Sequence, residues 1–244
     1  MRASDDPRWP PDGEPPDGDV GGTPPGVVPE RLCAIAVELL PVTGASASLR
    51  DGDGLPVRLC ASSDRASYLA EIQATLGDGP CVSAAETGAP VLARDLRSGA
   101  DADRWPVFAQ QATAVGVNAV YALPLGSDTV CVGTFDLYRG TAGGLTDPQL
   151  NTARLLAGVM TTALMALPRG EDYDLGGGVD AWLSGLGGGH DEAYQAIGMI
   201  MAQLGVGTDE ALARLRGAAF AQGRTAHDVA RDVLTHRQRF DLDG

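Results

Sequence analysis

The residues that could carry acid–base or metal chemistry are few in this chain and do not gather into one pattern. Its three histidines, His190, His227 and His236, all lie near the C-terminal end. A histidine-ligated metal or haem is therefore not expected in the preceding part of the chain. No nucleophile elbow, phosphate-binding loop or paired-carboxylate pattern occurs either. We expect a protein that is not an enzyme and that holds no metal or cofactor.

Four cysteines are present, and their spacing does not fit a zinc clip or a CxxC redox motif. They are Cys33, Cys60, Cys81 and Cys131, each in an apolar or small-residue context, which predicts buried, reduced thiols. Cys81 follows Pro80 at the start of a predicted short helix, where the helix dipole could lower the pKa of its thiol. A redox or thioether role at Cys81 is the alternative to a structural one.

Positive charge is concentrated near the C-terminus of an otherwise acidic chain. The formal net charge is −14, yet residues 211–239 carry +4 and leave −18 on the rest. A positive segment of this kind favours phosphate binding, whereas ordinary solvated helix faces are the alternative. Its six basic residues, like all others in the chain, are arginines: Arg214, Arg216, Arg224, Arg231, Arg237 and Arg239.

Two glycine- or proline-rich segments divide the chain. Residues 1–26 hold seven prolines, five glycines and six acids, a composition that predicts a disordered tail. Residues 168–190 are predicted to be a Gly-rich linker, with one short helical turn at 179–186. Domains are therefore expected at 27–167 and 191–240. With no signal peptide and no apolar run long enough to span a membrane, we expect a cytoplasmic protein.

The first domain mixes helical and strand patterns. Apolar periodicity and turn signals predict an α+β domain in which helices flank a central antiparallel sheet. The predicted helices are 29–40, 67–76, 104–117 and 146–167, and the predicted strands lie in hairpins at 44–62 and 118–140 and in a segment at 89–96.

The motif "GDGPCVSAAETGAPVLARDL" at 77–96, followed by "WPVFAQQATAVGVNAVYALPL" and "VGTFDLYRG", resembles a GAF domain of the actinobacterial type. The resemblance covers roughly 30–167. It implies a cytoplasmic sensory fold, with a pocket for a small molecule on one face of the sheet. It also implies helices on the other face that are used in dimerisation.

The second domain is predicted to be a bundle of three helices with clear boundaries. The first helix is expected at about 191–204, and "GVG" at 205–207 ends it. The second begins at Thr208, which is expected to act as its N-cap, and runs to about Gln222. The third is capped by Thr225, with Asp228 at the spacing of a capping box.

The stretch "QAIGMIMAQLGVGTDEALARLRGAAFAQGRTAHDVARDVL" resembles an ANTAR domain, the three-helix RNA-binding module of bacterial antiterminators. The resemblance implies an all-α bundle that acts as a dimer on RNA hairpins in leader transcripts. Ile197 stands where this family often has a lysine that contacts RNA, so one contact is missing or replaced. The residues expected to contact RNA are Gln195, Ala196, Gly198, Met201, Arg214, Arg216, Arg224 and Arg231.

Gly198 lies in the middle of a predicted helix, where glycine costs roughly 0.5–1 kcal/mol relative to alanine. Two explanations remain open for it: close helix–helix packing inside the bundle, or a smooth surface on which a nucleic-acid loop lies. Gln203 is a second glutamine that could hydrogen-bond a base or ribose, and Tyr194 is a candidate for base stacking.

The two resemblances together imply a homodimeric, signal-responsive regulator that binds leader-transcript hairpins and promotes transcription antitermination. A small molecule in the GAF pocket is its expected signal, and no membrane partner is expected. Three alternatives stay open: a DNA-binding regulator, an interaction protein whose bundle has lost RNA binding, and a sensor whose main role is in the GAF pocket.

Overall fold

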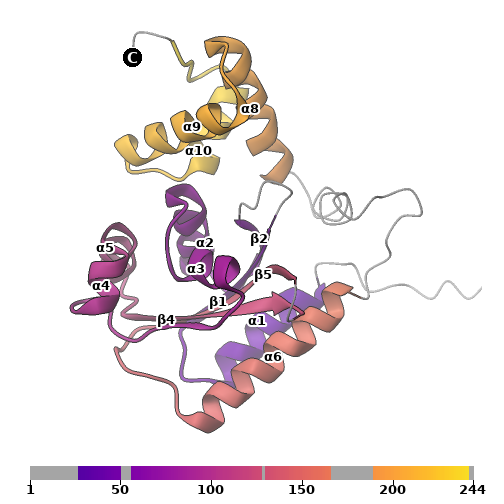
Figure 1. The fold of residues 1–244 in the computed structure, drawn as a ribbon, viewed down its shortest axis with the longest axis vertical. Coiled ribbons are helices and arrows are strands. Elements are labelled where there is room, and N and C mark those ends of the chain that lie inside the picture. The colour runs from indigo at the N-terminus through magenta and orange to yellow at the C-terminus, as the bar shows by residue number, and fades with distance from the viewer. Residues whose placement is uncertain (1–26, 51–55, 128–129, 166–188, 242–244) are drawn as a thin grey trace, which may run out of the picture.

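The computed structural model describes residues 27–50, 56–127, 130–165 and 189–241. The expected tail at 1–26, nearly all of the expected linker and the helical turn at 179–186 lie outside these ranges. The described residues form a sheet domain and a helical bundle (Figure 1).

The sheet has five strands, all paired antiparallel, in the order β2-β1-β5-β4-β3. Because both faces of this sheet are covered by helices, β1 is buried along almost its whole length. The strands are β1 (Gly44–Arg50), β2 (Pro56–Ala61), β3 (Val91–Ala93), β4 (Ala119–Gly126) and β5 (Cys131–Arg139).

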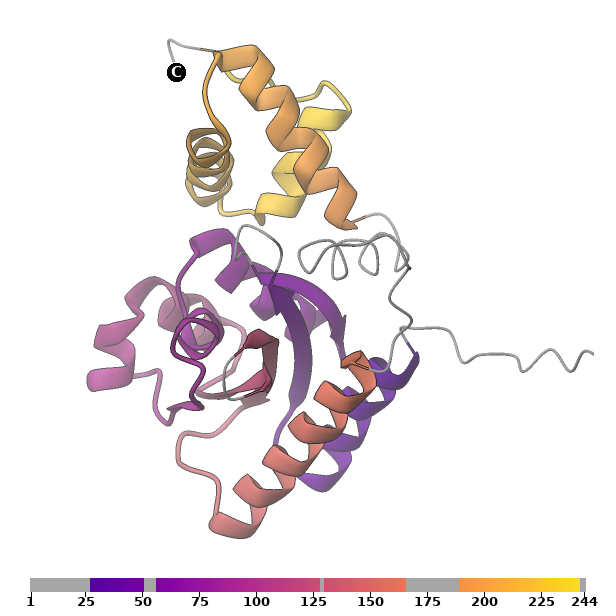
Figure 2. The ribbon, with the colours of Figure 1, turned by 45° about the vertical axis from the view of Figure 1, so that its right-hand side comes forward.

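Two helical layers enclose the sheet, as Figures 1 and 2 show. On one face, α1 (Val27–Leu39) and α6 (Asp147–Met165) pack together on an apolar core. The other face carries α2 (Asp64–Leu76), α3 (Pro80–Thr87), α4 (Ala100–Arg104) and α5 (Pro106–Ala114). This arrangement confirms the predicted α+β class with a central antiparallel sheet.

Some helix boundaries differ from those expected, for local reasons. α2 begins three residues before the predicted start, because the Ser63 hydroxyl accepts a hydrogen bond from the N–H of Ala66 and caps the helix. The helix predicted at 104–117 is divided at Trp105. Pro106, which has no N–H to donate, starts α5 there, and α4 precedes it.

The C-terminal bundle consists of α8 (Gly189–Leu204), α9 (Thr208–Gln222) and α10 (Ala226–Leu234), which confirms the predicted three helices. Thr225 caps α10 in a complete capping box with Asp228, as predicted. The expected cap at Thr208 is wrong. Gly207 is the N-cap of α9, and the Thr208 hydroxyl instead contacts the sulfur of Met201 at 3.7 Å.

The bundle lies against the sheet domain through α2, which α9 and α10 both contact. Figures 1 and 2 show the bundle above the C-terminal end of this helix. Within the described ranges, every helix is too short or too polar to cross a lipid bilayer.

Candidate functional site

A row of polar side chains lies on the sheet face that α2 and α3 cover. Side chains alternate between the faces of a strand, so Ser46 and Ser48 of β1 share a face with Thr134 and Asp136 of β5. The register pairs Ser46 with Asp136 and Ser48 with Thr134. All four side chains are buried, and the hydroxyls of Tyr138 and Ser46 are hydrogen-bonded at 2.9 Å.

The helices above this row add one more buried polar side chain, that of Gln73. Gln73 of α2 accepts a hydrogen bond at its Oε1 from the backbone N–H of Cys81, 2.8 Å away in α3. A Cβ atom at Gly79 would lie 2.7 Å from that same Oε1, so the glycine leaves room for the amide. Gln73 therefore joins the two helices over the polar row.

Two atoms of this polar interior have no hydrogen-bond partner within the described part of the chain: Oδ1 of Asp136 and Nε2 of Gln73. Buried polar atoms are normally satisfied, so these two remain available to a polar partner in this interior. Burial raises the pKa of Asp136 to about 8, with a hydrogen bond from Thr134 opposing the shift. At neutral pH the carboxyl group is mainly protonated and can both donate and accept.

The polar interior was missed by the sequence reasoning, which predicted a pocket only by resemblance. The available signal was the alternation of polar residues within two predicted strands, at 46 and 48 and at 134, 136 and 138. Without the register of the strands, this alternation indicates a sheet face exposed to solvent as readily as a buried face that carries polar side chains.

The cysteines provide no reactive thiolate in the polar interior. Burial raises the pKa of the Cys81 thiol, so the lowering expected from the helix N-terminus is wrong. Cys33 and Cys60 are buried and free, with their sulfur atoms 3.3 Å apart. Cys131 is only half-buried, unlike the other three. No group of histidine, cysteine and acidic side chains among the described residues could hold a metal ion.

On the bundle, α8 presents an exposed strip made of Gln195, Gly198 and Ala202. A Cβ atom at Gly198 would meet no atom within 4 Å, so close packing inside the bundle does not explain this glycine. Ala196 and Ile197 belong to the bundle core. Ala196 is fully buried, so its side chain does not reach the surface of the bundle. Ile197 likewise faces the core rather than the strip.

Two other residues of α8 that were predicted to contact RNA, Met201 and Gln203, are partly buried. Met201 is half-buried and packs against the core, with the Thr208 hydroxyl on its sulfur. The side-chain oxygen of Gln203 accepts a hydrogen bond from the N–H of Phe240 at 2.9 Å, so this amide holds the C-terminal segment in place.

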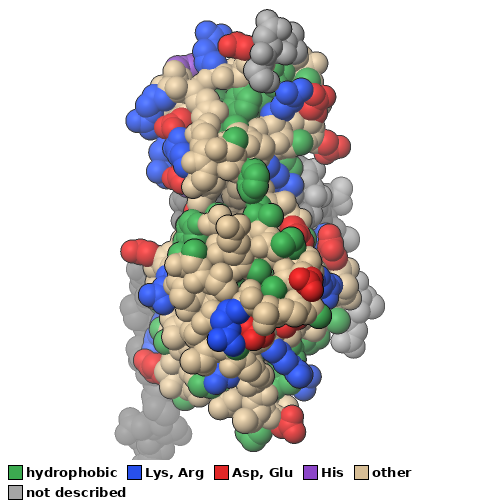
Figure 3. All heavy atoms as spheres, turned by 90° about the vertical axis from the view of Figure 1, so that its left-hand side faces the viewer, with side chains coloured by type: hydrophobic (Ala, Val, Ile, Leu, Met, Phe, Trp, Pro, Cys, Tyr) green, Lys and Arg blue, Asp and Glu red, His purple; other side chains and the backbone are tan. Residues whose placement is uncertain are grey.

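Two of the predicted arginines lie on the bundle surface in loose ion pairs. Arg214 pairs with Glu210 one turn earlier in α9 at 3.3 Å. Arg231 lies 3.6 Å from Glu192 and 2.8 Å from the imidazole of His227. Figure 3 shows one face of the molecule, on which the basic side chains of the bundle are interspersed with acidic ones.

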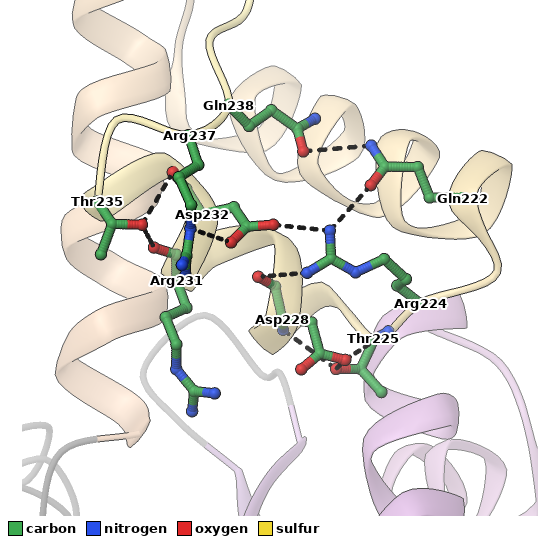
Figure 4. A network of polar contacts seen from close by, with 9 residues as sticks. All are labelled: Gln222, Arg224, Thr225, Asp228, Arg231, Asp232, Thr235, Arg237 and Gln238. Atoms are coloured by element: carbon green, nitrogen blue, oxygen red, sulfur yellow. Dashed lines mark hydrogen bonds and ion pairs between the residues drawn. The ribbon is translucent and has the colours of Figure 1, made fainter.

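Arg224 is the centre of a polar network that joins the end of α9 to α10 (Figure 4). Its guanidinium lies 2.7 Å from Asp232 and donates to the Asp228 carbonyl and the Gln222 side chain. Hydrogen bonds from Arg224 first, and then the charge of Arg237, lower the pKa of Asp232. Arg224 thus has a structural role within the bundle.

Arg216 faces the sheet domain instead of solvent. Its Nη2 donates a hydrogen bond to the carbonyl oxygen of Ala74, 3.1 Å away in α2. The eight residues expected to contact RNA therefore do not form one surface: Ala196 is buried in the bundle core, and Arg216 lies between the domains. Arg224 is half-exposed and is paired with Asp232 of α10.

Comparisons with known proteins match both parts of the chain. A family model described as GAF domain matches residues 27–165, and one described as ANTAR domain matches residues 190–234. A search of curated proteins gave no match.

Among solved structures, the GAF domain region of a protein from Geobacter sulfurreducens PCA is 15% identical, with a TM-score of 0.50 over 59% of this chain and 94% of that one. A GAF domain/HD domain protein from Geobacter sulfurreducens is 17% identical, with a TM-score of 0.44 over 59% and 93%. Type II free methionine-R-sulfoxide reductase from Thermoplasma acidophilum is 12% identical, with a TM-score of 0.43 over 59% and 93%. At 15% identity, the likeness to the GAF domain region from Geobacter sulfurreducens PCA extends to the fold alone.

The antiparallel sheet enclosed by helices and the three-helix bundle agree with these two family matches. A sensory domain followed by such a bundle is the domain pair of a signal-responsive regulator. The chain belongs to the GAF family through residues 27–165 and carries an ANTAR domain at residues 190–234.

Proposed function

We propose that this chain is a cytoplasmic regulator whose ANTAR bundle binds RNA hairpins in leader transcripts and promotes transcription antitermination. The observation that carries the proposal is the exposed strip of α8, at Gln195, Gly198 and Ala202, on a bundle that also presents Arg214 and Arg231 at its surface. A backbone without a side chain at Gly198 lets a nucleic-acid loop approach the helix closely. The regulator would have no catalytic activity of its own.

The surface arginines are suited to phosphate because their present partners bind weakly. Exposed ion pairs such as Arg214 with Glu210 contribute about 0–1 kcal/mol, so little is lost when a phosphate replaces the carboxylate. Gln195, which is exposed, supplies a donor and an acceptor for a base or ribose. Met201 lies beside the strip as an apolar contact. Ala196 in the bundle core and Arg224 in its network with Asp232 would support the proposed surface.

The signal would be a small molecule bound in the polar interior of the GAF domain. The proposal is supported by the unpartnered Oδ1 of Asp136 and Nε2 of Gln73, which a ligand with a donor and an acceptor would satisfy. We also propose that the chain is divided into a GAF domain at 27–167, a Gly-rich linker at 168–190 and an ANTAR domain at 191–240.

The protein would act as a homodimer through the outer face of α1 and α6. Large apolar side chains lie exposed there: Leu39 is 61%, Leu155 71% and Val159 52% exposed. Leu155 and Val159 are one turn apart on α6, and α1 packs beside that helix. Apolar patches of this kind on a water-exposed surface mark interaction sites.

The test compares full-length protein binding to a hairpin RNA and to duplex DNA of the same sequence, at low and moderate salt. We expect tighter binding to the hairpin, and weaker binding for a double variant with Arg214→Ala and Arg231→Ala. Tighter binding to duplex DNA would favour a DNA-binding regulator instead.

A second candidate is an interaction protein whose bundle has lost RNA binding. The observation that favours it is that Arg216 and Arg224 are both engaged within the protein. Hairpin affinity that is unchanged in the double variant would support this candidate. Crosslinking to RNA in cells, followed by sequencing of bound leaders, separates the two candidates in vivo.

A further inference from the structure

The last turn of α2 holds the ANTAR bundle by two hydrogen bonds. The Ala74 carbonyl accepts one from Nη2 of Arg216 at 3.1 Å. The Thr75 hydroxyl accepts the other from the backbone N–H of Ala226 at 2.9 Å. These two consecutive residues of α2 thus contact α9 and α10 at once.

Both contacts use groups that a helix end leaves without partners. The last carbonyls of a helix carry partial negative charge, which an arginine side chain complements. Ala226 is the first residue of α10, so its N–H has no partner within its own helix. Here Thr75 supplies an acceptor from the other domain.

The residue that ends α2 also makes room for the arginine. Gly77 has a φ of 63°, and its N–H donates to the Gln73 carbonyl to close the helix. A Cβ atom at Gly77 would lie 2.9 Å from Nη1 of Arg216. The glycine therefore serves both the left-handed turn and the approach of the guanidinium.

The docked arrangement engages Arg216, one of the arginines that the sequence predicts to contact RNA. Thr75 is only 3% exposed, although it lies at the end of a helix on the outer layer of its domain. While its guanidinium is bound to Ala74, Arg216 does not face a phosphate in solution. We infer that the contact of α2 with α9 and α10 is an autoinhibitory latch that masks Arg216 and the start of α10; this inference rests on the proposed RNA binding.

The latch lies on the same helical turn as the polar interior of the GAF domain. Gln73, one residue before Ala74, is fully buried, and its Nε2 has no hydrogen-bond partner in the described ranges. A ligand that binds this amide acts on the turn that holds the bundle. It opens the latch if it binds the released conformation of α2 more tightly than the docked one.

The experiment compares full-length wild-type protein with Thr75→Val, which removes the acceptor but keeps the side-chain shape. Thr75→Ser, which keeps the hydroxyl, is the matched control. Hairpin RNA affinity is measured by fluorescence anisotropy, and separation of the domains by small-angle X-ray scattering. Neither change touches a residue proposed to contact RNA.

We expect Thr75→Val to increase the radius of gyration and to tighten RNA binding by up to about fivefold, the change given by loss of one neutral hydrogen bond. Thr75→Ser should resemble the wild type in both measurements. Two results for Thr75→Val would overturn the latch and leave the proposed function intact. One is separation of the domains without tighter RNA binding, and the other is scattering and RNA affinity that are both unchanged. Absence of hairpin binding by all three proteins would instead refute the proposed function, and the latch with it.

Discussion

Asp136 of β5 lies directly opposite Ser46 of β1, on the sheet face covered by α2 and α3. The neighbouring ionisable groups, Cys81 and Tyr138, have raised pKa values and stay uncharged in this interior at neutral pH. Asp136 is therefore the group of this interior whose charge changes near neutral pH, since burial raises its pKa to about 8.

We predict that Asp136→Asn makes the protein more stable above pH 7 and removes a pH dependence. The folded protein keeps a proton on Asp136 up to about pH 8, whereas its pKa in the unfolded chain is near 3.8. Between these values the folded state binds more protons, so the free energy of unfolding falls as pH rises, by at most about 1.4 kcal/mol per pH unit.

The measurement is urea denaturation of the wild type and Asp136→Asn at several pH values from 5 to 8.5. The difference in stability in favour of the variant should grow with pH and level off above pH 8. Parallel stability curves for the two proteins would show that the Asp136 pKa is not raised by burial.

We predict that Leu155→Glu on α6 converts a homodimer into a monomer. Leu155 is 71% exposed in the single chain, so the substitution should leave the fold intact while placing a charge in the proposed apolar interface. Analytical ultracentrifugation at several concentrations measures the effect. Gln110→Glu is the matched control and should remain dimeric, because Gln110 is an exposed residue of α5, on the opposite face of the sheet. A wild type that is monomeric at all concentrations would contradict the proposed dimer.

The helices of the bundle could be predicted from the sequence because their signals are local. Thr225 and Asp228 are three residues apart, and the glycines at 205 and 223 end their helices in left-handed turns. The 3.6-residue period then identifies Ile200 and Leu204 as core residues. Such signals do not depend on the rest of the fold.

The sites could be predicted less well because they depend on contacts between distant segments. Thr75 and Ala226 are 151 residues apart, and nothing in the local pattern of either indicates the other. The net charge of a segment also does not show which of its arginines face solvent and which are bound within the protein. The structure distinguishes Arg224 from Arg214. Arg224, which follows α9, forms an ion pair with Asp232 of α10, whereas Arg214 pairs with Glu210 one turn away in its own helix.

This difference predicts stability losses of different size for alanine at the two arginines. Arg224→Ala should lower the free energy of unfolding by about 1–2 kcal/mol, because it removes hydrogen bonds that join α9 to α10. Arg214→Ala should cost about 0.5 kcal/mol or less, the usual contribution of an exposed pair one turn apart.

For RNA binding the order should reverse once stability is taken into account. Arg214→Ala is expected to weaken hairpin binding and to reduce the slope of log affinity against log salt by about one phosphate contact. Binding is measured well below the unfolding midpoint of each variant. Equal stability losses for the two variants would contradict the structural role of Arg224.

The last prediction concerns Gly198→Ala, which tests whether the exposed strip of α8 lies against RNA. Its Cβ would enter open space, so alanine should stabilise the bundle by roughly 0.5–1 kcal/mol. If the exposed strip of α8 lies against RNA, the added methyl group should nevertheless weaken hairpin binding. Gly217→Ala is the matched control, because Gly217 is also exposed in mid-helix with no atom near its Cβ position. It should gain similar stability with unchanged RNA affinity. Equal RNA affinity in both variants would mean that the nucleic acid does not approach α8 at this glycine.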